Sequence, residues 1–62
     1  PLTPCRAVLE TALAIEYAAY DLSRVMAHRF QGRLLGEVFN SIAEAEREHM
    51  RLVASGLGHC RG

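Results

Sequence analysis

Between Pro4 and Gly32 the chain contains neither glycine nor proline, the two residues that most often interrupt a helix. Pro4 suits the first helical position, where its missing N–H is not needed, and Thr3 before it suits the N-cap. We therefore predict a helix from about residue 4 to residue 30. No β-rich run competes with this interpretation.

The Gln31-Gly32 pair is the strongest break before Gly56-Leu57-Gly58, and it suits a short turn with glycine in the left-handed conformation. We predict a turn over 31–32, a second helix from about residue 33 to residue 55, and a flexible tail over 56–62. Two helices joined by so short a turn must be antiparallel neighbours. Residues 1–62 are thus predicted to form a single all-α domain, an antiparallel two-helix hairpin.

A hairpin of 62 residues cannot hide its apolar surface alone. Half of the residues are hydrophobic, whereas a chain of this size buries only about 60% of the surface that its unfolded form exposes. Small domains of this kind usually need a metal, a disulfide or a partner chain. Association with further copies is the expected result.

Charge and hydropathy exclude two classes of partner. The net charge is zero and the seven basic residues, all arginines, are scattered, whereas a nucleic-acid-binding protein normally shows a basic stripe. No apolar run approaches the roughly 18 residues of a membrane span, and no signal peptide is recognisable. We predict a cytoplasmic protein that binds neither nucleic acid nor membrane.

The two cysteines, Cys5 and Cys60, lie near opposite ends of the sequence. In a hairpin both would lie at the same open end, so a disulfide between them is geometrically feasible. Because cytosolic disulfides are rare, two free thiols are the favoured expectation.

One stripe of each helix is predicted to face the other helix, at about 100° per residue. In the first helix the stripe comprises Leu9, Ala12, Leu13, Glu16, Ala19, Tyr20, Ser23, Ala27 and Phe30. In the second it comprises Leu35, Phe39, Ile42, Ala43, Glu46, His49, Met50 and Val53. Both stripes are largely apolar, yet each is interrupted near its middle by an acid, and the second also by a histidine.

These interruptions, Glu16, Glu46 and His49, are candidate metal ligands. An unpaired buried carboxylate is strongly unfavourable, so two acids and an imidazole on facing stripes require a common compensating charge. Gln31 is the midpoint between the two glutamates, which places them at about the same height in a hairpin. Residues 46 and 49 lie one helical turn apart on one face. Oxygen donors with one imidazole suit iron or manganese better than structural zinc.

One hairpin supplies only two carboxylates and one imidazole, whereas two hairpins supply four glutamates and two histidines. That larger set is the ligand set of ferritin-like di-metal bundles. The segment from Glu37 to His49 resembles the rubrerythrin helix that carries a bridging glutamate and, three residues on, a histidine. The segment Ala14-Ile15-Glu16-Tyr17 is similar to the terminal-glutamate helix of that family, and the spacing of the glutamates resembles that of encapsulated ferritins.

The resemblance covers about residues 9–53 and implies a hairpin that dimerises into a ferritin-like four-helix bundle. It implies that Glu16 and His49 are terminal ligands, that Glu46 bridges two iron or manganese ions per dimer, and that all three residues serve catalysis. The implied function is that of a ferroxidase, an oxidoreductase that oxidises Fe(II) with O2 or peroxide for iron storage or detoxification. A homodimer or an oligomer of dimers is the implied assembly, with an encapsulin nanocompartment as a further partner by analogy.

The chain also departs from these families. It has no rubredoxin module, Ala19 stands where some rubrerythrins carry an extra glutamate, and Ser23 stands where encapsulated ferritins carry an aromatic residue. No encapsulin-targeting tail is recognisable after Gly58. A peroxide-reducing rubrerythrin relative and a non-catalytic, metal-stapled dimerisation module therefore stay open as alternatives.

Other polar residues have plainer interpretations. We predict that Glu44 and Glu48 lie off the stripe and pair with Arg47 or Arg51. His28 falls in the last turn of its helix, where the helix dipole favours a cation, and His59 in the tail is assigned no role. Tyr20 is predicted to pack in the core rather than to act as a redox partner. For the three candidate ligands the alternative is a solvated polar face with a hydrogen-bonded histidine.

Overall fold

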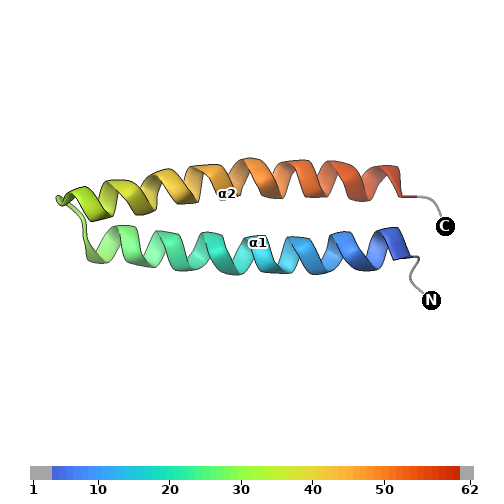
Figure 1. The fold of residues 1–62 in the computed structure, drawn as a ribbon, viewed down its shortest axis with the longest axis horizontal. Coiled ribbons are helices and arrows are strands. Elements are labelled where there is room, and N and C mark those ends of the chain that lie inside the picture. Colours follow the sequence, from blue (N-terminus) through green and yellow to red (C-terminus); the bar gives the residue numbers. More distant parts are fainter. Residues whose placement is uncertain (1–3, 61–62) are drawn as a thin grey trace.

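A computed structural model describes residues 4–60 as two long antiparallel helices joined by a tight turn (Figure 1). Helix α1 spans Pro4–Arg29 and helix α2 spans Leu34–His59, and each has 26 residues. The predicted all-α hairpin is thus confirmed, with α1 beginning at Pro4 as expected. Thr3, the predicted N-cap, lies outside the described residues. Within those residues no helix is long and apolar enough to cross a bilayer.

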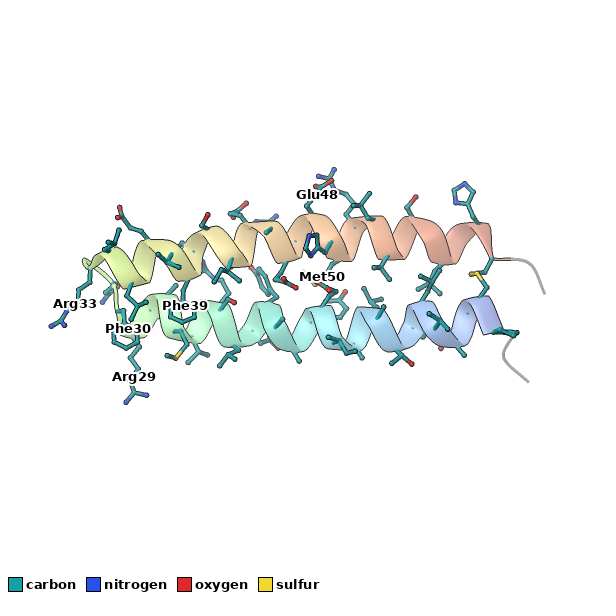
Figure 2. The ribbon with its side chains drawn as sticks, viewed as in Figure 1. Arg29, Phe30, Arg33, Phe39, Glu48 and Met50 are labelled. Atoms are coloured by element: carbon teal, nitrogen blue, oxygen red, sulfur yellow. A yellow bond between two sulfur atoms is a disulfide. The ribbon has the colours of Figure 1, made fainter. Side chains whose placement is uncertain are left out.

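The turn depends on Gly32, whose φ of +81° lies in the left-handed region that glycine adopts without strain. The Phe30 N–H still donates to the Met26 carbonyl oxygen at 3.0 Å, and the Arg33 N–H donates to the Phe30 carbonyl oxygen at 3.1 Å. The phenyl rings of Phe30 and Phe39 stack across the hairpin with centroids 6.5 Å apart (Figure 2). The predicted turn and its glycine are therefore confirmed, and an aromatic pair closes this end.

Gly36, in the first turn of α2, is one of four buried residues in the described part of the chain, with Ser23, Ala27 and Ala43. A Cβ atom at this position would overlap the Phe30 carbonyl oxygen and would lie 3.3 Å from the Ala27 carbonyl oxygen. The absence of a side chain thus lets α2 approach the end of α1 closely.

We expect Gly36→Ala to lower the free energy of unfolding by about 1–3 kcal/mol, because overlap with backbone atoms outweighs the helix propensity gained. Gly58→Ala is the matched control, since a Cβ there meets nothing within 4 Å. That variant should be stabilised by up to about 1 kcal/mol. Urea unfolding of both variants checks the prediction, and equal shifts in the same direction would contradict it.

The helices meet along an interhelical seam whose residues recur every three or four positions. On α1 and the residue that follows it, the seam comprises Leu9, Leu13, Glu16, Tyr20, Ser23, Ala27 and Phe30. On α2 and the residue that follows it, the seam comprises Gly36, Phe39, Ala43, Glu46, Met50, Val53, Leu57 and Cys60. All of them are buried or half-buried. Figure 2 shows Met50 directed from α2 toward α1 and Glu48 directed away from it.

The two broad faces of the hairpin differ in character. Residues that directly follow a seam residue form the polar face, which comprises Glu10, Tyr17, Asp21, Arg24, His28, Glu37, Asn40, Glu44, Arg47 and Arg51. In antiparallel helices such residues lie on the same side of the hairpin, and the hydrogen bond from Arg24 Nη1 to Asn40 Oδ1 at 3.5 Å crosses this face.

Residues that directly precede a seam residue form the opposite, apolar face. Its large exposed hydrophobic members are Val8, Ile15, Leu22, Leu35, Val38, Ile42 and Leu52, each between 40% and 65% exposed, and Met26 on the same face is half-buried. The exposed members are seven of the ten large hydrophobic residues exposed in the described part of the chain. The hairpin therefore leaves one whole side apolar and open.

The prediction that α2 stops at Gly56 and gives way to a flexible tail is wrong, because the helix continues to His59. A glycine lowers helix propensity by only about 1 kcal/mol, which tertiary contacts can offset. Here a Cβ at Gly56 would lie 3.2 Å from Leu9 Cδ1, so α1 packs against this turn. The Cys60 N–H, which donates to the Leu57 carbonyl oxygen at 3.2 Å, closes the helix.

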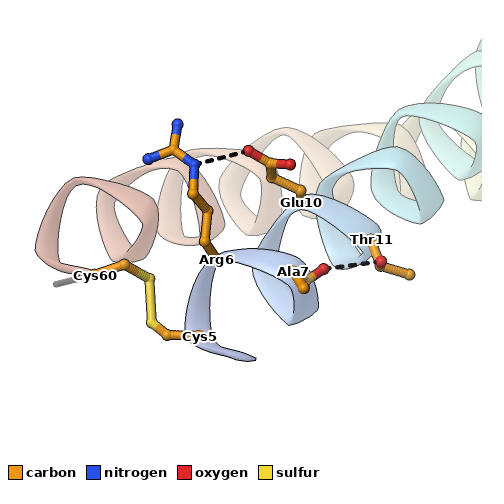
Figure 3. Close-up of polar contacts among 6 residues, drawn as sticks. All are labelled: Cys5, Arg6, Ala7, Glu10, Thr11 and Cys60. Carbon is orange, nitrogen blue, oxygen red and sulfur yellow. Dashed lines mark hydrogen bonds and ion pairs between the residues drawn. A yellow bond between two sulfur atoms is a disulfide. The ribbon is translucent and has the colours of Figure 1, made fainter. Parts of the chain in front are cut away.

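The expectation of two free thiols is also wrong, because Cys5 and Cys60 form a disulfide at the open end of the hairpin (Figure 3). Their Cα atoms are 5.9 Å apart, inside the usual range for a disulfide. The extra turn of α2 carries Cys60 to the height of Cys5 in the first turn of α1. Nearby on α1, Arg6 Nε pairs with Glu10 Oε1 at 3.1 Å.

Candidate metal centre

The three predicted ligands converge at the middle of the hairpin. Glu16 is the thirteenth residue of α1, and Glu46 is the thirteenth residue of α2. His49 follows one turn later on α2, with Nδ1 3.3 Å from Glu16 Oε2 and 3.7 Å from Glu46 Oε1. One donor atom from each residue can be chosen so that all three lie within 4.8 Å of one another. This spacing allows them to hold a single metal ion.

The two carboxylates are withdrawn from solvent, whereas the histidine is not. The side chains of Glu16 and Glu46 are 23% and 16% exposed, and that of His49 is 54% exposed. Glu16 Oε2 is buried and has no hydrogen-bond partner, and it is alone in this respect among the side-chain oxygens and nitrogens of residues 4–60. A buried acceptor without a partner is unfavourable, and a cation at this point would satisfy it.

The Glu16 carboxylate also makes ionisation of Glu46 less favourable. A hydrogen bond shared with Glu16 raises the pKa of Glu46 above its usual value, and burial and the charge of Glu16 raise it further. The nearby His49 offsets part of this rise. A Glu–His ion pair needs one acid, not two at close range. A multivalent cation at this point would offset the charge of both acids.

His49 lies on the apolar face, because it directly precedes the seam residue Met50. We predicted that Leu35, Ile42 and His49 would belong to the buried stripe, and this is wrong, since they are 45%, 40% and 54% exposed respectively. A two-helix seam buries only a narrow row of residues, and positions one residue away fall at its edge. The site consequently opens onto the apolar face.

One hairpin offers only two carboxylates and one imidazole, which leaves a metal ion with open coordination positions. None of the three candidate ligands lines the hollow of about 170 Å³ beside Arg24 and His28 or the hollow of about 520 Å³ beside Glu44 and Arg51.

The remaining polar residues lie away from the cluster or serve local contacts. Glu44 pairs with Arg47 at 3.9 Å, and Glu48 pairs with Arg51, so both predicted surface pairs are confirmed. His59 belongs to the last turn of α2, where its Nδ1 lies 2.8 Å from the Ser55 carbonyl oxygen. Tyr20 is half-buried in the seam one turn after Glu16.

No protein-family model, curated protein or solved structure matches this chain. Function is therefore inferred from the residues of the site and their geometry.

Proposed function

We propose that the chain is a di-iron protein that oxidises Fe(II) with O2 or peroxide, at a site completed by a second copy of the chain. The observation that carries this proposal is the cluster of Glu16, Glu46 and His49 at the midpoint of both helices. Two such clusters together would supply four glutamates and two histidines, the ligand set of ferritin-like di-metal bundles. The resemblance of residues 9–53 to rubrerythrins and encapsulated ferritins supports the same function.

The donor chemistry supports iron over structural zinc. Carboxylates with one imidazole per hairpin suit iron or manganese, whereas structural zinc sites are usually rich in thiolate. Both cysteines are committed to a disulfide at the far end of the hairpin. The buried Oε2 of Glu16, which has no hydrogen-bond partner, lies where a cation would be bound.

In the proposed reaction each of two Fe(II) ions gives up one electron. The two electrons reduce O2 with two protons to hydrogen peroxide, or reduce peroxide with two protons to water. In this proposal Glu46, which is less exposed than His49, would bridge the two ions, and Glu16 and His49 would each hold one ion. The role of the chain is to bind and orient the ions and to leave positions open for the oxidant.

The proposed assembly is a homodimer or an oligomer of dimers that forms a four-helix bundle. An encapsulin shell enters this proposal only through the resemblance to encapsulated ferritins. The predicted cytoplasmic location stays a prediction, and the Cys5–Cys60 disulfide weighs against a reducing compartment.

Iron content and Fe(II) oxidation test the function together. We expect the wild-type protein to bind two Fe(II) ions per dimer and to turn over Fe(II) with O2. Glu46→Ala should lose iron from both positions, whereas Glu16→Ala should lose less, because a bridging carboxylate serves both ions. Metal analysis and stopped-flow oxidation of wild type and both variants provide the measurement.

The controls separate the alternatives. Glu44→Ala, on the polar face of the same helix, should leave iron loading unchanged. Equal, near-wild-type loading in Glu46→Ala and Glu16→Ala would contradict the assigned roles. Consumption of peroxide with a reductant, without turnover of Fe(II) by O2, would favour the peroxide reductase, and bound metal with neither activity would favour the non-catalytic module.

A further inference from the structure

We propose that the apolar face is the surface on which a second copy of this chain docks, so that the two ligand clusters meet across it. The inference deepens the proposed function, which requires a second hairpin without saying which side receives it. It stands on three observations: the composition of the face, the position of the ligand cluster on it, and its size.

The apolar face has the composition of an interface. Its seven large exposed members are aliphatic, with Ala12, Ala19 and Ala45 between them. In the described chain the apolar face carries no carboxylate. Its one arginine is Arg29, at the turn. All seven charged members of the polar face lie on the opposite side. Because an exposed apolar surface of this extent marks an interaction site, the face is expected to be covered.

The position of the ligand cluster indicates which molecule covers the apolar face. The cluster opens onto the apolar face through His49, and it lies at the midpoint of both 26-residue helices. A two-fold axis that lies in the plane of the interface and passes through this point would overlay the two faces and bring the two clusters together. Any other partner would have to bring its own carboxylates and imidazole to the same point. A second copy already carries them at the correct height.

The size of the face fits a stable dimer. The hairpin measures 47 Å by 16 Å across its broad side, which corresponds to a plan area close to the ~800 Å² that each partner buries in a standard interface. A lipid surface is a poorer match, because membrane-binding helices carry lysine and arginine along the border of the apolar stripe. Here the chain has no lysine, and the apolar face carries one arginine, Arg29 at the turn.

Paired substitutions on and off the face provide the test. Leu22→Glu with Val38→Glu places two charges on the apolar face, away from the ligands, at side chains 61% and 45% exposed in the hairpin. Val25→Glu with Leu34→Glu is the matched control, since these residues are 60% and 77% exposed but lie off the face. Circular dichroism establishes that each variant keeps its helices.

Sedimentation of each protein, with Zn(II) as a redox-inert probe and without metal, measures the dimer dissociation constant. We expect wild type and control to have twice the 6.9 kDa chain mass, and the face variant to dissociate at least about a hundredfold more readily, because burying unpaired charges is strongly unfavourable. A face variant that dimerises as tightly as the control would overturn the inference, and so would a wild-type monomer at micromolar concentration with metal present.

The outcomes separate this inference from the proposed function. A dimer that is disrupted by the face variant but takes up no iron would retain the docking surface and refute the di-iron function. A face variant that dimerises as tightly as the control and still takes up and oxidises Fe(II) would refute the docking surface and retain the di-iron function.

Discussion

Reduction of the Cys5–Cys60 disulfide should lower the free energy of unfolding by about 4 kcal/mol, the chain-entropy value for a loop closed across a separation of 55 residues. For a chain of this size, such a loss corresponds to a fall in Tm of about 15 °C or more. The bond joins the first turn of α1 to the residue that ends α2, so its loop contains nearly the whole hairpin.

The seam is less well buried near the open end of the hairpin, which makes the Cys5–Cys60 disulfide more important there. The four buried residues, Ser23, Ala27, Gly36 and Ala43, all lie between the turn and the ligand cluster. Beyond Glu16 and Glu46, toward the termini, the described seam residues are only half-buried. The disulfide is therefore the main constraint that holds the helices together in that half of the hairpin.

Thermal and urea unfolding at a fixed chain concentration, with and without a dithiol reductant, measure the effect. The double variant Cys5→Ser/Cys60→Ser should resemble the reduced wild type and should not respond to the reductant. Titration of thiols in the unfolded, unreduced protein should find none. Oxidised and reduced proteins that differ by less than about 1 kcal/mol would show that the open end is held by packing instead.

The hairpin and the convergence of its ligands could be predicted from short-range features. The run without glycine or proline, and then Gly32, define two helices and the turn between them. Once the turn is placed, the equal distances from Gln31 to Glu16 and Glu46 bring the two acids to one height. Such predictions depend only on helix geometry, which is why they hold.

The hairpin made a disulfide feasible, but the position of Cys60 depends on where α2 ends. A helix that stopped at Gly56 would leave Cys60 on a loose tail, whereas the observed helix carries it to Cys5. Propensity alone does not include the contact between Gly56 and Leu9 that supports the last turns. Free thiols were expected only because cytosolic disulfides are rare, so the wrong thiol state follows from the predicted compartment, whereas the wrong helix end follows from tertiary contacts.

The side of the hairpin occupied by His49 was missed for a different reason. A helical projection at 100° per residue places seam residues and the residues that directly precede them in one stripe. The two sets can be distinguished only when the buried row between the helices is known to be narrow. The signal was present, since Leu35, Val38, Ile42, Ala45, His49 and Leu52 recur every three or four residues beside the seam. A second apolar stripe of this kind indicates a second interface.

Divalent metal should raise the melting temperature of the protein, and chelation should lower it. In the metal-free dimer four carboxylates would meet in one place, and their repulsion is already evident within one hairpin, where Glu16 raises the pKa of Glu46. Metal ions replace this repulsion with attraction. Each site favours the folded, assembled state by RT ln(1 + [L]/Kd), about 2.7 kcal/mol at a hundredfold excess of metal over Kd.

The double variant Glu46→Ala/His49→Ala removes the effect at its source. Its melting temperature should not respond to Fe(II), Mn(II) or Zn(II), because only Glu16 of the cluster is left. Without metal, this variant should be at least as stable as the metal-free wild type, because the half-buried Glu46 carboxylate no longer repels that of Glu16. The control Glu44→Ala/Glu48→Ala removes two acids from the outer side of the same helix and should respond to metal as wild type does. Thermal melts of the three proteins, each with metal and with chelator, decide the question: if the Glu46→Ala/His49→Ala variant gains as much stability from metal as the control, the ions are bound elsewhere and the cluster is not a metal centre.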